Sequence, residues 1–446
     1  MRRNFILNLL ILCTMPPLLI ILAITCAASL AQDQNNYDVD DPSTVILTNI
    51  IFRHGDRTPV DPYPTDPYRN VSVYWPEGLG QLTDVGKEQH YRLGQYFRKR
   101  YSTLLPKKYN LNDVLVRSTD VDRTLMSAES NLAGFFPPVN QWDADLKWSP
   151  IPVHTVPETL DKLVSMKYPC PRYESELKKL MESDYVKKLN AQYQDVYDYL
   201  TEHSGRKIQD PTTLQYIFNT MWIENLKNME LPNWTKKVFP DRMKDLAAIS
   251  FSLNAYTEEM KRLKGGPLVG EIVQHMKQKK EKTLTPNRKL FLYSAHDTTV
   301  ANILMTLGIF DTQIPAYTSS IILELHKLPA EKYAVSILFK NETKREPYKL
   351  TLPGCSFRCP LDDFVKLTAS MIPEDWMAEC QLGTEQTFLA SDEAKLLRNL
   401  SITVVIGSGI VVLLLISLLV LAIAFLQQRN RNNNFRYSPL SHNLYA

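Results

Sequence analysis

Three short apolar runs, each followed closely by charged side chains, constrain the fold of this 446-residue chain more than any other feature. The runs cover Val45–Phe52, Val114–Val116 and Leu290–Tyr293. Continuous apolar runs of this kind are typical of strands that are buried on both faces of a mainly parallel sheet. Such sheets are covered by helices and bind ligands beyond the carboxyl ends of their strands. The sequence therefore predicts an α/β fold whose charged side chains gather at one edge of the sheet.

Helical and strand patterns fill in the rest of this fold. Thr83 can cap a helix in which apolar side chains recur every four residues as far as Tyr101. A second helix is expected after the second apolar run and ends at Gly134, because glycine suits the backbone at a helix C-terminus. Two later runs, 321–326 and 333–340, have strand patterns and are expected to close the sheet.

The segment from about residue 150 to 285 differs in character from the rest of the chain, because it consists of long charged stretches with helical periodicity. We interpret it as a mostly helical cap domain inserted into an α/β core of about residues 44–150 and 285–380. The predicted fold is thus a mainly parallel central sheet flanked by helices, with an inserted cap and a single C-terminal transmembrane helix.

The first 31 residues, 1–31, have the layout of a cleavable signal peptide. Two arginines precede the apolar run Phe5–Ile24, and small residues end the segment at Ala31. An uncleaved signal anchor is the alternative, but Pro16 and Pro17 interrupt a continuous helix. We expect cleavage after Ala31.

An uncharged apolar segment, residues 402–426, matches the roughly 20 residues that span a hydrocarbon core. Three arginines follow it within ten residues, so the positive-inside rule places the tail, residues 427–446, in the cytosol. Residues 32–401 are then expected in the lumen, as in a single-pass type I membrane protein. A buried core helix is the alternative, but such helices normally carry a polar stripe.

The expected lumenal part carries cysteines and glycosylation sequons that suit an oxidising compartment. It has four cysteines: Cys170, Cys355, Cys359 and Cys380. They predict two disulfide bonds, and the sequence leaves three possible pairings open. A zinc site is the alternative, but no second close pair of ligands completes a tetrahedral set. Three sequons are expected to be glycosylated: Asn70, Asn233 and Asn341.

The arginines that follow the apolar runs point to phosphate chemistry. Transfer of a phosphoryl group develops negative charge on its equatorial oxygens, so catalysis depends mainly on well-placed cations. Arg53, Arg57 and Arg117 can supply them, because each guanidinium presents a planar fork that matches phosphate oxygens. We expect these three side chains to bind the phosphoryl group without a metal ion or other cofactor.

Two further residues can carry the covalent chemistry. His54, between the first two arginines, can attack phosphorus as a neutral imidazole and form an intermediate that water later hydrolyses. The leaving alkoxide needs a proton, and Asp297, beside His296, is the available acid. Each residue alone is a weak indication, but so many cations at a strand end have little structural purpose without an anion.

The string RHGDRTP, residues 53–59, resembles the R-H-G-x-R-x-P motif of the histidine acid phosphatases. Segments 116–124 and 294–299 are similar to the other active-site segments of this family, in the same order. The likeness runs from about Val45 to Cys380 and is greatest to lysosomal and prostatic members. It implies hydrolysis of phosphate monoesters through phosphorylated His54 in an α/β domain with a helical cap. It also implies a pocket of six residues, in which His296 helps to hold the phosphoryl group: Arg53, His54, Arg57, Arg117, His296 and Asp297.

The same resemblance bears on covalent and quaternary structure. It implies disulfide bonds Cys170–Cys380 and Cys355–Cys359, while a third disulfide that is common in vertebrate members is missing. Similar proteins dimerise through a segment like Trp148–His154, so the resemblance implies a homodimer.

The expected cytosolic tail contains Tyr437-Ser-Pro-Leu440, which is similar to the tyrosine-based signals that clathrin adaptors bind. Lysosomal members of the family carry a tyrosine signal in the same place. We therefore expect the protein in the lysosomal or endosomal membrane, with residence at the cell surface as the alternative.

Substrates are expected to be small phosphomonoesters, with phosphoproteins and phospholipids as further candidates. A net charge of +3, without a basic stretch interleaved with aromatic residues, makes nucleic acid an unsuitable partner. Two alternatives stay open: an inositol-polyphosphate phosphatase, which a strongly basic pocket rim would favour, and an inactive receptor-like ectodomain. The six intact pocket residues argue against the second.

Overall fold

The computed structural model describes residues 41–139, 142–382 and 415–429. The chain forms two units, one up to Cys380 and one from Gln381. The expected signal peptide and the tail motif at Tyr437 lie outside the described residues, so both stay predictions.

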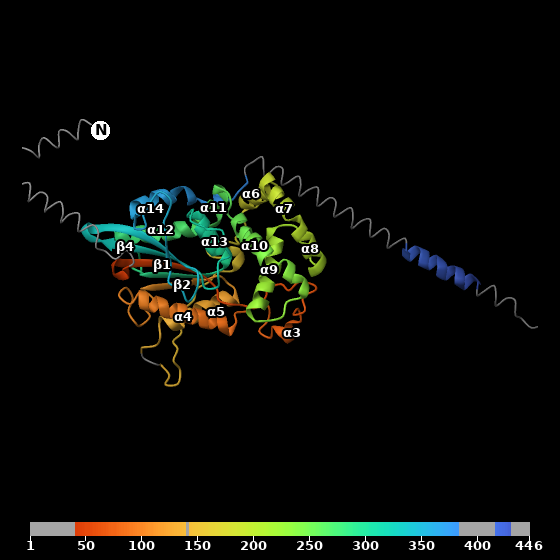
Figure 1. Cartoon of the computed structure of the whole chain (residues 1–446), viewed down its shortest axis with the longest axis horizontal. Coiled ribbons are helices and arrows are strands. Elements are labelled where there is room, and N and C mark those ends of the chain that lie inside the picture. The colour runs from red at the N-terminus through yellow and green to blue at the C-terminus, as the bar shows by residue number, and fades with distance from the viewer. Residues whose placement is uncertain (1–40, 140–141, 383–414, 430–446) are drawn as a thin grey trace, which may run out of the picture. The chain divides into compact units, whose positions relative to one another are not determined.

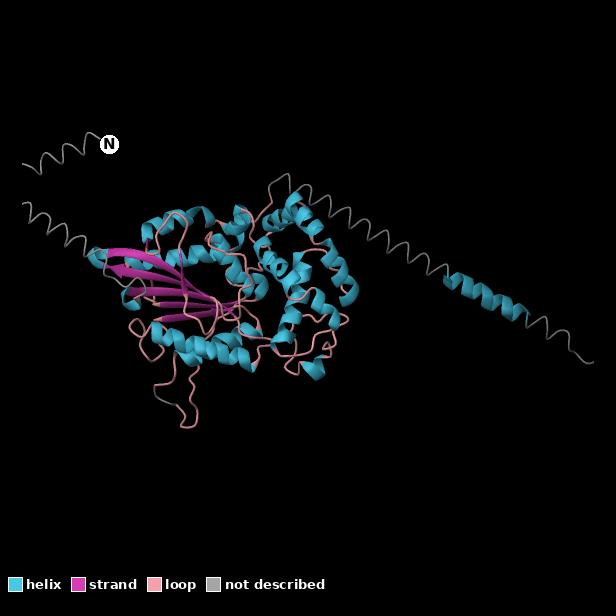
Figure 2. Ribbon diagram, viewed as in Figure 1, coloured by secondary structure: helices cyan, strands magenta, loops and turns pink. Residues whose placement is uncertain are grey.

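A single seven-stranded sheet lies between two layers of helices in the first unit (Figure 2). Its strand order is β2-β3-β1-β4-β5-β6, and β7 also pairs with β5. The strands are β1 (Val45–Arg53), β2 (Val114–Ser118), β3 (Leu290–Ala295), β4 (Ser320–Leu328), β5 (Lys332–Lys340), β6 (Tyr348–Leu350) and β7 (Cys359–Pro360). All five strands that the sequence predicts are present.

The sheet is mixed, so the prediction of a mainly parallel sheet is wrong. Only the pairs β2–β3 and β3–β1 are parallel, whereas β4 pairs antiparallel with both β1 and β5. For β4 and β5 the reason is the length of their connection, which is the three-residue 3-10 turn Pro329–Glu331. A parallel pair needs a crossover of a dozen or more residues, which this turn cannot provide.

Helices cover both faces of the sheet, as expected. The helices α4 (Asp84–Arg100) and α5 (Asp122–Phe135) pack on one face, and α12 (Gly266–Glu281), α13 (Asp297–Thr306) and α14 (Leu361–Thr368) on the other (Figure 1). Strand β1 shows why: Ile50 and Phe52 enter one apolar core, while Leu47 and Ile51 enter the other. Strand β1 thus buries both of its faces, because successive side chains alternate.

Helix α4 starts where predicted, since the Thr83 side chain accepts a hydrogen bond from the amide of Gly86. Helix α5, however, continues past Gly134 to Phe135. Gly134 serves close packing instead of ending the helix: a Cβ atom there would lie 2.1 Å from the carbonyl oxygen of Tyr91 on α4. Gly94 on α4 meets α5 in the same way.

Between residues 155 and 289 the described chain contains helices and no strand. These helices are α6 (Pro171–Met181), α7 (Asp184–Gln192), α8 (Gln194–Ser204), α9 (Pro211–Leu226), α10 (Asp241–Leu253), α11 (Glu258–Lys264) and α12. Helices α8, α9 and α10 share an apolar core of their own beside the sheet, on the right in Figure 1. Helix α12 lies within the range expected for the cap but packs against the sheet. Two short helices complete the unit: α3 (Val71–Tyr74) and α15 (Trp376–Glu379).

The second unit is described only in part. Residues 415–429 form a helix with exposed apolar side chains. Within the described parts of the chain, no helix combines the length and hydropathy that a bilayer crossing requires. Residues 402–414 of the expected membrane segment lie outside the described residues, so the segment as a whole stays a prediction.

Candidate active site

The carboxyl ends of β1 and β3 bring four of the predicted site residues together. Arg53 is the last residue of β1 and pairs in register with Ala295, the last residue of β3. The amide of His54 donates to the Ala295 carbonyl at 3.0 Å, and β3 leads directly into His296 and Asp297 at the start of α13. Because parallel neighbouring strands end at the same edge, residues some 240 positions apart in sequence become neighbours in space.

His54 is buried and held as a neutral imidazole. Its Nδ1 lies 2.8 Å from the carbonyl oxygen of Gly55. A carbonyl only accepts hydrogen bonds, so Nδ1 carries the proton and Nε2 keeps a free lone pair. Burial, followed by the charges of Arg53, Arg123 and Arg57, lowers the pKa of His54 well below its ordinary value. The neutral form that a nucleophile requires is therefore the stable one.

Three contacts hold the side chain of Arg53. Its Nη2 forms an ion pair with Oδ2 of Asp297 at 2.8 Å, and its Nη1 donates to the Pro315 carbonyl. Its guanidinium lies 4.3 Å from the ring centroid of Tyr317, which is a cation–π distance. These contacts fix the orientation of Arg53 beside His54.

Arg57 takes its orientation from the cap. Its Nη2 donates to Oδ1 of Asn219 on α9 at 2.8 Å, and its Nη1 donates to the Thr58 carbonyl at 3.0 Å. Arg57 and His54 line one cavity.

A second arginine lines this cavity, Arg123, which the sequence reasoning missed. Arg123 is the second residue of α5, and its Nη2 lies 3.5 Å from Nδ1 of His296. Burial, then the charge of Arg57, lowers its pKa to about 10. Its Nε has no hydrogen-bond partner among the described residues, so it can donate to an incoming anion.

Arg117 is not among the residues that line this cavity. Its Nη2 instead forms an ion pair with Asp161 at 2.8 Å, and Asp161 is buried. Arg117 lies inside β2, one residue before the strand ends, while Arg123 lies in the first turn of a helix whose N-terminus faces the site. That helix start could have identified Arg123, because helix N-termini favour anions.

His296 and Asp297 complete the group. Nε2 of His296 lies 3.0 Å from Oγ1 of Thr119, and burial, then the charge of Arg123, lowers the pKa of His296 to about 3. Burial works to raise the pKa of Asp297, but the charges of Arg53 and Arg57 outweigh it and lower the pKa. In the free protein His296 is therefore neutral and Asp297 is an ion-paired carboxylate.

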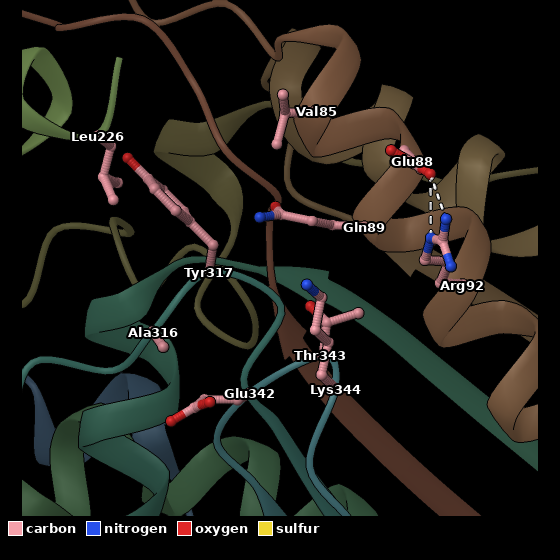
Figure 3. A pocket seen from close by; sticks show the side chains of 10 residues that line it. All are labelled: Val85, Glu88, Gln89, Arg92, Leu226, Ala316, Tyr317, Glu342, Thr343 and Lys344. Atoms are coloured by element: carbon pink, nitrogen blue, oxygen red, sulfur yellow. Dashed lines mark hydrogen bonds and ion pairs between the residues drawn. The ribbon is translucent and has the colours of Figure 1, made fainter. Parts of the chain in front are cut away.

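These side chains line a cavity of about 350 Å³ that we term the phosphoryl cavity: His54, Arg57, Arg123, His296 and Asp297 form its inner end. Its outer part is mostly polar and holds one lysine, Lys167. A second cavity of about 520 Å³, the side cavity, shares Asn219 with it and is also lined by Arg53. A third, of about 550 Å³, lies between α4 and the loop at Tyr317 (Figure 3) and contains none of the six predicted residues.

Both disulfide bonds implied by the family resemblance are present, Cys170–Cys380 and Cys355–Cys359. Of the sequon asparagines, Asn70 and Asn233 are exposed. Asn341 is partly buried, and its Nδ2 donates to Gln313 at 2.7 Å. The described residues contain no cluster of three or more potential metal ligands.

Comparison with known proteins gives consistent matches. Residues 44–340 match the model of the histidine phosphatase superfamily (branch 2). Human prostatic acid phosphatase is 42% identical over 355 residues, which cover 76% of this chain and 90% of that protein. Bovine lysosomal acid phosphatase is 39% identical over 349 residues, covering 76% and 81%. The apo structure of Hafnia alvei phytase is similar in fold, with a TM-score of 0.57 at 19% identity over 76% of this chain and 98% of that one.

Proposed function

We propose a mechanism, a substrate range and a location for this chain, which belongs to branch 2 of the histidine phosphatase superfamily. It is an enzyme, a phosphoric monoester hydrolase of the acid phosphatase type. The single observation that carries the mechanism is a neutral, buried His54 whose Nε2 is free and which is surrounded by three arginines.

In the first step, Arg53, Arg57 and Arg123 bind the phosphoryl oxygens and Nε2 of His54 attacks phosphorus. The bond from phosphorus to the ester oxygen breaks as the bond to Nε2 forms, and Asp297 donates a proton to the departing alkoxide. In the second step, Asp297 accepts a proton from water, which attacks the phosphohistidine and releases inorganic phosphate. The arginines stabilise the negative charge in both steps.

The protonation state of Asp297 has to change for this mechanism to work. In the free protein the charges of Arg53 and Arg57 keep its pKa low. A bound phosphoryl dianion engages the same arginines and adds negative charge nearby, and both effects raise the pKa of a carboxyl group. Substrate binding thus supplies the condition under which Asp297 takes up the proton that it later donates, and a mildly acidic lumen favours this uptake.

The test compares leaving groups. Asp297→Ala should slow hydrolysis of alkyl phosphates by about 10²–10⁴-fold more than hydrolysis of nitrophenyl phosphate, because a phenolate of low pKa leaves without a proton. His54→Ala should abolish turnover of both substrates, since it removes the nucleophile. Equal losses for the two substrates in Asp297→Ala would contradict the general-acid role, and turnover near wild type in His54→Ala would contradict the covalent intermediate.

The charge of the outer cavity favours substrates with a single phosphoryl group. Among the described residues, Lys167 is the one lysine or arginine that lines the outer part of the phosphoryl cavity. Its Nζ forms an ion pair with Glu158 at 2.9 Å. An inositol polyphosphate carries several dianionic groups, and each needs a cationic partner to offset its desolvation. We therefore expect kcat/KM to be higher for small monoesters than for phytate, and a preference for phytate would refute this assignment.

We further propose that the enzyme acts in the endolysosomal lumen, anchored by residues 402–426. The apolar segment and the tail motif support this, and so do relatives that are named lysosomal acid phosphatase. Tyr437→Ala should move the protein to the cell surface, and an unchanged distribution by imaging would remove the adaptor signal from the proposal.

Dimer formation is a separate proposal. Trp148 is 39% exposed in a loop where Trp142 is also exposed, and large exposed aromatic side chains are typical of interfaces. Trp148→Glu should shift the lumenal domain from dimer to monomer in analytical ultracentrifugation. A wild-type domain that sediments as a monomer would contradict the dimer.

A further inference from the structure

We propose that Asn219, on helix α9 of the cap, is a positioning residue that holds Arg57 through a neutral oxygen and so preserves phosphate affinity as pH rises. The proposal rests on the proposed function, because it concerns the same phosphoryl cavity. It assigns to a cap residue a share in phosphate binding at the sheet edge.

The contact itself is well defined. Oδ1 of Asn219 accepts from Nη2 of Arg57 at 2.8 Å, and the two residues are 8% and 7% exposed. A guanidinium only donates, so Asn219 must present its oxygen to Arg57 and cannot present its amide nitrogen there. Nδ2 of Asn219 has no hydrogen-bond partner among the described residues, and the side chain lines both the phosphoryl cavity and the side cavity.

The two arginines beside His54 differ in what they bind. Arg53 pairs with the carboxylate of Asp297, which offsets its charge. The two side-chain hydrogen bonds that Arg57 forms with described residues both go to neutral oxygens, those of Asn219 and the Thr58 carbonyl. The side chain of Arg57 is therefore oriented while its charge stays available to a phosphoryl dianion. A carboxylate at position 219 would keep the orientation but would compensate that charge and repel the dianion.

The charged and titratable groups around this contact come from the sheet edge, α5, the cap and the loops: Arg53, His54, Arg123, Lys167, Tyr216, His296, Asp297, Tyr317, Lys244, Asp245 and Glu342. None of them is replaced when Asn219 alone is changed. A carboxyl group introduced there would be ionised at neutral pH and would have to take up a proton, or repel the dianion, when phosphate binds. Proton uptake becomes more costly as pH rises, so the loss of affinity should grow with pH.

The experiment measures the dissociation constant of inorganic phosphate by calorimetry on the lumenal domain as secreted, at about pH 5 and about pH 7.5. For Asn219→Asp we expect binding about tenfold weaker than wild type at the higher pH, with a clearly smaller loss at the lower pH. Asn219→Leu removes the oxygen, and we expect it to weaken phosphate binding about tenfold at both pH values. Loss of a hydrogen bond to a charged group typically has an effect of about this size. Asn225→Asp makes the same chemical change at an exposed position on α9 and should bind phosphate as wild type does.

Three results separate the possible failures. If the loss in Asn219→Asp is the same at both pH values, or if Asn219→Leu binds phosphate like wild type, Asn219 does not position Arg57 as proposed. Circular dichroism and the melting temperature of each variant show whether the fold is intact. If the wild-type protein neither binds phosphate nor turns over a monoester, the proposed function itself fails, and this outcome does not depend on any variant.

Discussion

Replacing Glu224 by glutamine should make the free energy of unfolding less sensitive to rising pH. Glu224 on α9 and Asp66, in the loop after residues 53–59, are 0% and 2% exposed. When both carboxyl groups are ionised, neither oxygen of Glu224 accepts a hydrogen bond from a described residue. Oδ1 of Asp66, by contrast, accepts from the amide of Tyr68 at 2.7 Å. Two carboxylates in contact repel each other, so the pair is stable only when one proton lies between them.

The structure sets the size of the effect. Burial, then the charge of Asp66 and its hydrogen bond, raises the pKa of Glu224 from 4.5 to about 9. Because the folded state holds a proton that the unfolded state releases above about pH 4.5, stability is lost at about 1.4 kcal/mol per pH unit above that value. The loss continues until the pH reaches the folded pKa. Between about pH 5 and about pH 7.5 it amounts to roughly 3 kcal/mol.

The assay is urea-induced unfolding at several pH values, with the free energy of unfolding plotted against pH. Glu224→Gln donates an N–H to Asp66 at every pH, so its curve should be flatter by about 1.4 kcal/mol per unit. The variant should then be more stable than wild type near pH 7.5. Glu230→Gln changes an exposed carboxylate close by and serves as the control. Parallel curves for wild type and Glu224→Gln would refute the shared proton.

Three further predictions follow from particular contacts. Arg123→Ala should weaken binding of inorganic phosphate by about 10- to 100-fold, as measured by calorimetry. Arg117→Ala loses the ion pair with Asp161, so it should lower the melting temperature and keep the phosphate affinity of the wild type. The reverse pattern would show that Arg117, and not Arg123, binds phosphate. Gly94→Ala places a Cβ atom 1.9 Å from the Asn131 carbonyl oxygen, so it should lower the free energy of unfolding by about 3 kcal/mol. An unchanged midpoint of urea-induced unfolding would contradict this close packing. Turnover should be unaffected by EDTA, because the arginines supply the positive charge; loss of activity that a divalent ion restores would contradict the histidine mechanism.

Local sequence determined the strands and the placement of the proposed catalytic pair, His54 and Asp297. The apolar runs before Arg53 and His296 are long enough to be buried on both faces, so parallel pairing of β1 and β3 places His54 and Asp297 at one edge. Thr83 determined the start of α4 in the same local way, through one side-chain oxygen and an amide three residues on. These features depend on residues that are close in sequence, or on a single rule about strand ends.

Tertiary structure decided which arginine enters the cavity. Arg117 and Arg123 lie six positions apart in one segment, and residue type does not distinguish them. The ion pair with Asp161 binds Arg117, while the first turn of α5 carries Arg123 to the cavity beside His296. That outcome depends on the placement of Asp161, 44 positions after Arg117, which no local pattern expresses.

Tertiary structure also decided the contacts between the cap and the sheet edge. Asn219 meets Arg57 across 162 positions of sequence, and Glu224 meets Asp66 across a comparable separation. The antiparallel half of the sheet was also decided beyond the strand patterns, because periodicity shows that a strand is buried but not which neighbour it pairs with. Hydrogen-bond partners and ion pairs between distant segments depend on packing in three dimensions, so only the folded structure establishes them.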